Sequence, residues 1–173
     1  VGDQVSYRVV VTNTAPGTIA REVHISDIGL PEGLVLSGGT ASVEVLNAPV
    51  QVDYPIPDRK TGQAAEVRQV ATALDADERG WNFYCSYLPY SHPVTILFHC
   101  TATETCNGRE NINAATVQAE NAAEKSDDAK AYVNTGAFWI EKTADHYEWQ
   151  VGEAVEYQVV VTNQFPGTIA RNV

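Results

Sequence analysis

Residues Val1 to Val23 read VGDQVSYRVVVTNTAPGTIAREV, and residues Val151 to Val173 read VGEAVEYQVVVTNQFPGTIARNV. The two stretches are identical at 16 of 23 positions, at an offset of 150 residues. A repeat of this kind is typical of a protein built from tandem modules. Each copy also alternates polar residues with Val or Tyr before a Pro-Gly pair, which is the pattern of a half-buried β-strand followed by a turn. We therefore expect tandem β-modules with a period of about 150 residues.

The repeat predicts two units within the chain. Residues 1–136 would form one module, and residues 137–173 would form the first two strands of the next. The segment 137–150 (AFWIEKTADHYEWQ) stands before the second copy and has no counterpart before the first. We therefore expect the module at 1–136 to lack its first strand.

A module without its first strand would present an unpaired sheet edge, and such an edge is a template for strand addition. The tail of a neighbouring copy would then pack in the vacant slot or against the strand that carries Val5, Tyr7, Val9 and Val11. A head-to-tail contact of this type is heterologous and can propagate into a filament. The partners we expect first are therefore neighbouring repeats or other copies of the chain.

Composition excludes several classes of protein. Hydrophobic residues make up 44% of the chain and charged residues 19%, which is typical of a globular protein. Eleven Lys and Arg face 22 Asp and Glu, a net charge of -11, so the chain lacks the basic face that nucleic acids require. No apolar run approaches the roughly 20 residues of a membrane span. We expect neither a nucleic-acid partner nor a membrane span.

The strand signals have a period of two along most of the chain. Short segments rich in Val, Ile, Thr and aromatic residues are separated by Pro, Gly, Asn and Asp. They are residues 4–13, 23–27, 41–46, 50–54, 81–88, 94–103, 112–120 and 129–134. This pattern predicts an all-β sandwich. Asn107-Gly108 is the best two-residue hairpin turn, residues 88–93 (LPYSHP) predict a longer loop, and residues 63–74 (QAAEVRQVATAL) predict a strand.

Four motifs in order carry a resemblance to a known family. They are VGDQVSYRVVVTN (1–13), HISDIGLPEGLVLSG (24–38), NINAATVQAEN (111–121) and WIEKTAD (139–145). Together they resemble the repeat modules of Gram-positive surface and fimbrial proteins, namely the isopeptide-forming D2-type pilin domains and related conserved-repeat sandwiches. The resemblance implies an Ig-like, CnaA-like β-sandwich in a secreted protein of the cell wall or of a surface appendage. Residues 50–80 are the least family-like part.

The resemblance also implies an amide crosslink that the protein makes between a lysine and an asparagine. By motif position, Lys142 is the lysine of the second module, and Asp27 and Asn113 are the acid and the asparagine of the first. Asn111 is the second choice for the asparagine. The lysine must be neutral to attack, and a buried, protonated carboxyl can polarise the amide and move protons. This chemistry needs no cofactor and runs once per molecule, so it is maturation and not enzymatic turnover.

Each of these residues also has a simpler interpretation. Lys142 can be a solvated charge at a domain start. Asp27 precedes the segment 30–34 (LPEGL) and can cap a turn. Asn113 can be a hydrogen-bonded amide at a strand edge.

The chain has three cysteines, Cys85, Cys100 and Cys106. In an extracellular β-module we expect one disulfide and one remaining thiol, and the sequence leaves the pairing open. There is no Cys-x-x-Cys spacing and the four histidines are scattered, so no metal site is expected. His99 precedes Cys100, but adjacent residues on a strand face opposite sides, which excludes a Cys-His nucleophile.

The alternative function is an adhesin module that binds a host surface ligand. Residues 75–80 (DADERG) concentrate carboxylates and suggest either a calcium site or a solvated turn. Aromatic residues flank the 88–93 loop and suggest either a glycan-stacking platform or core residues: Trp81, Tyr84, Tyr87, Tyr90 and His92. A conventional enzyme is the least supported reading, because no motif supplies a nucleophile, a base and oxyanion donors together.

Overall fold

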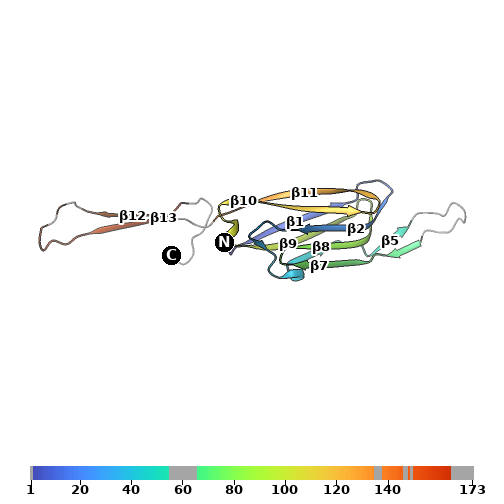
Figure 1. Ribbon diagram of the computed structural model, residues 1–173, viewed down its shortest axis with the longest axis horizontal. Helices are drawn as coiled ribbons and strands as arrows, with labels where there is room; N and C mark the ends of the chain where they lie inside the picture. The colour runs from blue at the N-terminus through green and yellow to red at the C-terminus, as the bar shows by residue number, and fades with distance from the viewer. Residues whose placement is uncertain (1, 55–65, 135–137, 146–147, 149, 165–173) are drawn as a thin grey trace. The chain divides into compact units, whose positions relative to one another are not determined.

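The computed structural model describes residues 2–54, 66–134, 138–145, 148 and 150–164. It divides into two units, Val1–Val133 and Asn134–Val173. In the first unit all the named strands pair antiparallel, and they form two sheets packed face to face together with a separate two-stranded ribbon (Figure 1). The all-β sandwich predicted from the strand periodicity is confirmed.

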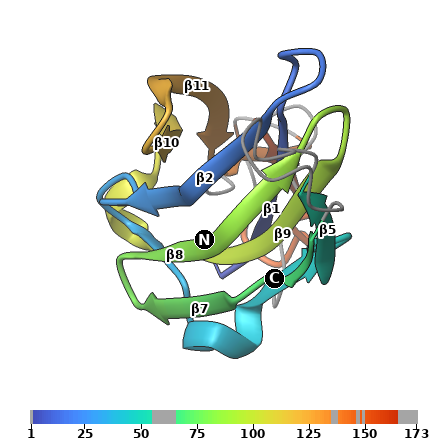
Figure 2. The same cartoon turned by 90° about the vertical axis from the view of Figure 1, so that its right-hand side faces the viewer.

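One sheet has five strands in the order β11-β10-β2-β8-β7. These are β11 (Ala122–Val133), β10 (Arg109–Ala119), β2 (Ile19–Ile28), β8 (Gly80–Pro89) and β7 (Thr72–Asp77). In the other sheet β9 is central: β1 pairs on one side of it, and β3 and β4 pair on the other. These strands are β1 (Gln4–Thr12), β9 (Pro93–Ala102), β3 (Leu34–Val35) and β4 (Val43–Leu46). The end-on view shows the two layers, with β2, β8 and β7 on one side and β1 and β9 on the other (Figure 2).

A two-stranded ribbon extends the sandwich between β4 and β7. It consists of β5 (Gln51–Tyr54) and β6 (Glu66–Gln69), and short 3₁₀ turns lie at η1 (Gly39–Ser42) and η2 (Glu104–Cys106). The prediction of one continuous strand over 63–74 is wrong in its described part, because β6 ends before β7 begins. The chain changes partner at this break: Val70 N donates to Val50 O, whereas Ala71 O accepts from Ser86 N. Residues 63–65 lie outside the described residues.

The hairpin turns differ from those predicted in one place. Asn107-Gly108 does not close a hairpin; it connects η2 to β10, and Gly108 N donates to Val133 O. The turn between β7 and β8 lies instead at Glu78 and Arg79, where Asp77 Oδ1 accepts from Arg79 N at 2.7 Å. The connection predicted at 88–93 joins β8 to β9 but is shorter than predicted, because β8 continues to Pro89 and β9 begins at Pro93, which leaves residues 90–92 between them.

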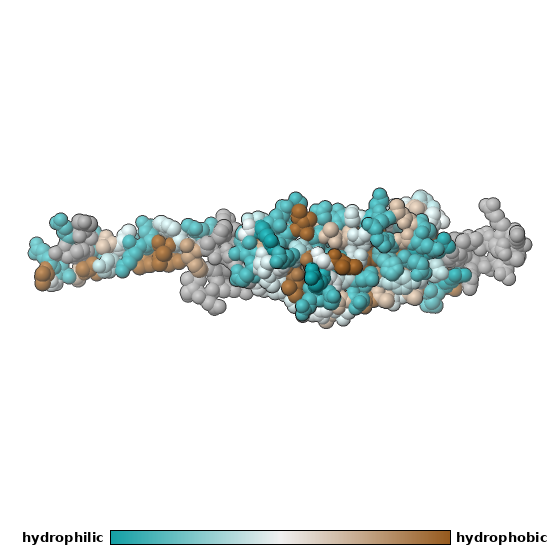
Figure 3. Space-filling model, viewed as in Figure 1, coloured by the Kyte–Doolittle hydropathy of each residue, from teal (hydrophilic) through white to brown (hydrophobic). Residues whose placement is uncertain are grey.

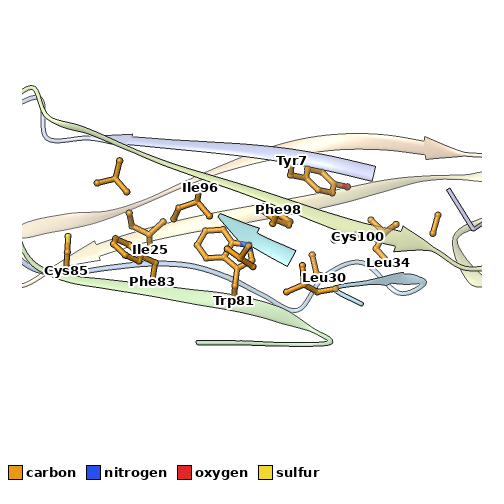
Figure 4. Close-up of a cluster of buried hydrophobic side chains, with 14 of the residues drawn as sticks. Tyr7, Ile25, Leu30, Leu34, Trp81, Phe83, Cys85, Ile96, Phe98 and Cys100 are labelled. Atoms are coloured by element: carbon orange, nitrogen blue, oxygen red, sulfur yellow. The ribbon is translucent and has the colours of Figure 1, made fainter. Parts of the chain in front are cut away.

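The core lies between the inner faces of the two sheets and is rich in aromatic side chains (Figure 4). Trp81 from the five-stranded sheet meets Phe98 from the other sheet, with ring centroids 5.4 Å apart. Tyr7 stacks on the same Phe98 at 5.1 Å. Aromatic pairs at these spacings bury large apolar areas and add favourable ring interactions. The core therefore ties β1, β8 and β9 together.

The second unit contains one antiparallel hairpin, β12 (Phe138–Ala144) with β13 (Tyr157–Asn163). Its large apolar side chains are exposed; Ile140, for example, is 66% exposed. Apolar side chains gather along this hairpin in the space-filling view (Figure 3). A lone two-stranded hairpin is at best marginally stable in water. Across the described part of the chain, no helix has the length and apolar character needed to cross a membrane.

Candidate functional site

A groove runs along the side of β1 that faces away from β9. Among the described residues, β1 pairs only with β9 and β11 pairs only with β10, so each presents an unpaired edge. The groove has a volume of about 460 Å³. Its walls come from four strands: residues 6–12 of β1, Ile25 and Asp27 of β2, Asn113 and residues 115–117 of β10, and residues 125–129 of β11.

Asp27 and Asn113 lie together in this groove although 86 residues separate them in the sequence. Asn113 Nδ2 donates a hydrogen bond to Asp27 Oδ2 at 2.5 Å. Both residues are buried, with Asp27 only 1% exposed. The pairing of β10 with β2 covers only residues 116–118 of β10, and Asn113 lies before that paired part. The structure thus brings together the predicted acid and the first-choice asparagine.

Burial controls the proton affinity of the acid. It raises the pKa of Asp27 from 3.8 to about 6, and the hydrogen bond from Asn113 acts in the opposite direction. The Oδ1 atom of Asn113 is also buried and has no hydrogen-bond partner among the described residues. A protonated Asp27 could donate to that oxygen after a half-turn of the amide, since the two amide ends differ only in donor and acceptor roles. The protonated carboxyl of Asp27 can therefore form a hydrogen bond to the side-chain amide of Asn113.

Tyr7 forms the apolar wall beside this pair. Its hydroxyl is buried without a hydrogen-bond partner among the described residues. Burial is the main cause that raises the pKa of Tyr7 to about 12, and the nearby Cys100 and Asp27 add to it. Tyr7 was expected only as a strand residue, not as a site residue. Its recurrence as Tyr157 in the second copy of the repeat was the available signal.

The backbone of Asp27 is fixed by a close approach of Gly80 on the neighbouring strand β8. A Cβ atom at position 80 would lie 2.0 Å from the carbonyl oxygen of Asp27. Only glycine fits this contact. Asp27 therefore sits inside a paired strand with its carboxyl directed at Asn113, and the alternative of a turn-capping role for this carboxylate does not describe the structure.

Asn111, the second-choice asparagine, has a different environment. Its Nδ2 donates to the backbone carbonyls of Cys106, Arg109 and Ala131. It is buried, but it is not among the residues that line the groove. This amide supports the local backbone and is not placed against a carboxyl group.

Lys142, the predicted lysine, belongs to the second unit and lies on β12. It is exposed, and its Nζ lies 4.3 Å from the centroid of the Tyr157 ring on β13. A cation at this distance from an aromatic face is attracted by the ring electrons. The hairpin thus holds the amine over the counterpart of Tyr7.

All three cysteines are free, buried thiols, so the expected disulfide is not present in the structure. Cys85 lies on β8 and Cys100 on β9, strands of opposite sheets. Cys106 Sγ donates to Thr103 O at 3.0 Å. Burial raises the pKa of Cys85 to about 11 and is the main cause that raises that of Cys100 to about 12. Cys85 and Cys100 are therefore poor nucleophiles.

The histidine next to Cys100 faces the opposite way, as predicted. His99 is exposed, and its Nδ1 lies 2.9 Å from Ser6 Oγ, whereas Cys100 is buried. The alternation of side chains along β9 separates the two groups. The structure therefore agrees with the exclusion of a Cys-His nucleophile.

The aromatic residues around the 88–93 loop do not form one platform. Trp81 is a core residue, and Tyr87 receives a hydrogen bond from Arg68. His92 Nε2 contacts the carbonyl of Asn47, and Tyr90 is about half exposed. The acidic run at 75–80 is the end of the β7–β8 hairpin. Within the described ranges, no three His, Cys, Asp or Glu side chains converge as metal ligands would.

Neither a family model nor a curated protein sequence matches this chain. Among solved structures it is similar to the collagen-binding subdomain of the Enterococcus faecalis surface protein ACE, which is a β-sandwich domain of a Gram-positive surface protein. The identity is 13%, the alignment covers 76% of this chain and 88% of that one, and the TM-score is 0.40.

Proposed function

We propose that the first unit is a structural repeat module of a bacterial cell-surface or fimbrial protein, strengthened by a self-made amide between a lysine and Asn113. The observation that carries this proposal is the buried Asp27–Asn113 pair in the groove beside the unpaired edge of β1. In this proposal the lysine comes from a strand that fills the groove. The module acts as a scaffold and uses no cofactor.

The chemistry follows from the groups in the groove. A neutral lysine Nζ attacks Cγ of Asn113, and Asp27 supplies a proton to the departing Nδ2 and accepts one from Nζ. The new Cγ–Nζ bond replaces the Cγ–Nδ2 bond, and ammonia leaves. An acid with a pKa near 6 suits both proton transfers, because general catalysis is most effective when the pKa lies near the working pH.

The position of the pair supports the proposal energetically. Beside the buried side chains of Tyr7 and Ile25 in the groove, the amine loses its hydration, which favours the neutral and reactive form. A fixed amine and amide react as one molecule, and this can lower the barrier by roughly 7 to 11 kcal/mol. Asp27 and Asn113 are held by strands of the same sheet, so the acid and the amide are in place before the incoming lysine arrives.

A hybrid chain tests the proposal. Residues 137–150 are placed directly before Val1, as they stand before Val151, so that Lys142 arrives on a first strand. The folded hybrid should be lighter than its sequence by about 17 Da, the mass of the ammonia lost. The Asn113→Ala variant should keep the full mass, and the matched Asn111→Ala variant should still lose ammonia. A folded hybrid of unmodified mass would remove the crosslink from the proposal.

Assembly is the second part of the proposal. In a tandem array each groove is filled by the segment that precedes it. Where that segment is absent, the strand can come from another copy, which gives a head-to-tail contact between modules. Because the contact does not close on itself, it produces filaments.

A further inference from the structure

The repeat relates the hairpin of the second unit to the open edge of the first. Residues 157–163 (YQVVVTN) correspond to residues 7–13 (YRVVVTN) at the offset of 150. β13 is therefore the counterpart of β1, and β12 is a strand already paired with that counterpart. Its register places Lys142 opposite Val159, which corresponds to Val9.

From this register we propose that the groove binds the strand 138–144 of a second copy of the chain, antiparallel to β1, with Lys142 opposite Val9. The inference builds on the proposed function, since it identifies the strand that brings the lysine. Binding itself does not require the amide to form. Because β9 already occupies one side of β1, the incoming strand takes the groove side.

The two faces of the strand match this placement. On β1, Tyr7 is buried and Val9 and Val11 are partly buried, whereas the residues between them are exposed. Directly opposite residues in an antiparallel pair share a face of the sheet. In the register of the hairpin, the strand residues that share this inward face stand opposite the counterparts of Asn13, Val11, Val9 and Tyr7. They are, in that order, Phe138, Ile140, Lys142 and Ala144. Lys142 is thus the one charged side chain on the face of the strand that would enter the groove.

The same register carries the amine to the reactive pair. In the hairpin, Lys142 Nζ lies over the ring of Tyr157. The counterpart of that ring is Tyr7, which lines the groove together with Asp27 and Asn113 and whose hydroxyl is influenced by the charge of Asp27. A lysine held over Tyr7 would therefore face this pair.

Chain direction shows why the strand comes from a second copy. The antiparallel pairings and the short β8–β9 loop make β11 run opposite to β1. A strand antiparallel to β1 then runs in the same direction as β11. It must start at the end of the sandwich opposite to Val133, where β11 ends. The five steps from Val133 to Phe138 span at most about 18 Å, whereas β1 from Gln4 to Asn13 is about 30 Å long. The chain cannot fill its own groove in this direction.

The apolar face of β12 and the open edge of β1 are both uncovered in the described part of the structure. Phe138 is 51% exposed and Ile140 is 66% exposed on the hairpin, while the groove exposes an unpaired strand edge. Transfer of β12 from β13 to the edge of β1 in another copy would cover the apolar face of β12 and the open edge of β1. The transfer replaces the pairing of β12 with β13 by a pairing with β1, the repeat counterpart of β13.

A peptide binding assay tests the inference. The probe is a fluorescent peptide of residues 137–150 with Lys142→Met, titrated into the full chain and followed by polarisation. We expect saturable binding that falls at least tenfold with Ile140→Asn in the peptide and less than threefold with Trp139→Asn, because residue 140 faces inward and residue 139 outward. In the chain, Val9→Asp should abolish binding and Val10→Asp should retain it, with circular dichroism to verify the fold.

The outcomes separate this inference from the proposed function. Absence of binding, or equal losses for Ile140→Asn and Trp139→Asn, overturns the docking register. The peptide with Lys142 intact is then incubated with the chain, and an adduct lighter by about 17 Da than the sum of the two masses shows amide formation. Binding without an adduct sustains the docking and contradicts the crosslink. A hybrid chain that forms the crosslink, together with absence of peptide binding, sustains the crosslink and contradicts the docking register.

Discussion

Replacing Asp27 by asparagine should stabilise the first unit at neutral pH. Asp27 is buried and meets Asn113, so its ionised form is costly inside the sandwich. The substituted side chain keeps the shape of the original and an oxygen that accepts the hydrogen bond, but it carries no charge at any pH. The gain should therefore appear only where the wild-type carboxyl is ionised.

The magnitude follows from the pKa. A rise from 3.8 to about 6 means that the folded state binds the proton more tightly than the unfolded chain does. The free energy of unfolding contributed by this group is then fully present below pH 3.8 and is lost as pH rises through about 6. At 1.36 kcal/mol per pKa unit the total loss is about 3 kcal/mol. Roughly half of it falls between pH 5 and pH 8.

Urea unfolding followed by tryptophan fluorescence at several values of pH measures this effect. The difference in unfolding free energy between Asp27→Asn and the wild type should grow by about 1.5 kcal/mol from pH 5 to pH 8. The exposed Asp75→Asn variant controls for the loss of one negative charge from a chain with net charge -11. A difference that is constant with pH, or that shrinks as pH rises, would refute the assignment of a raised pKa to Asp27.

Three further predictions concern the site and its support. In the hybrid chain, Asp27→Ala should abolish the loss of about 17 Da while the sandwich stays folded, because the proton donor is gone; an undiminished loss in the mass spectrum points to another carboxylate. Gly80→Ala should lower the free energy of unfolding by about 1 to 3 kcal/mol in a urea titration, because the new methyl group meets the carbonyl of Asp27. Iodoacetamide should add three adducts to the chain in denaturant without reductant and none to the native chain, since Cys85, Cys100 and Cys106 are free and buried; a single adduct in denaturant would indicate a disulfide.

Local pattern was sufficient for most strands because side-chain alternation is a property of neighbouring residues. The alternation in residues 4–13 and 94–103 predicted two strands, which the structure has at Gln4–Thr12 and Pro93–Ala102, and burial follows the same period. The local pattern failed in the strand predicted over 63–74, which breaks between β6 and β7 because the chain exchanges one partner strand for another. It also failed at Asn107-Gly108, whose turn sequence connects a 3₁₀ turn to β10. Partner exchange depends on distant strands, so no local pattern reports it.

The sequence alone determined the repeat and the β-sandwich class, since these depend on internal similarity and on the alternation of neighbouring side chains. The residues of the candidate site, and the order of Asn113 before Asn111, came from the resemblance of four motifs to a known family. Only the tertiary structure separated the two asparagines physically: Asn111 is engaged by three backbone carbonyls, and Asn113 meets the carboxyl of Asp27. The structure alone also decided that the cysteines are unpaired and that Tyr7 lines the same groove as Asp27 and Asn113. The contact of Asp27 with Asn113 joins residues 86 positions apart, and its distance is set by how β2 and β10 lie side by side in one sheet.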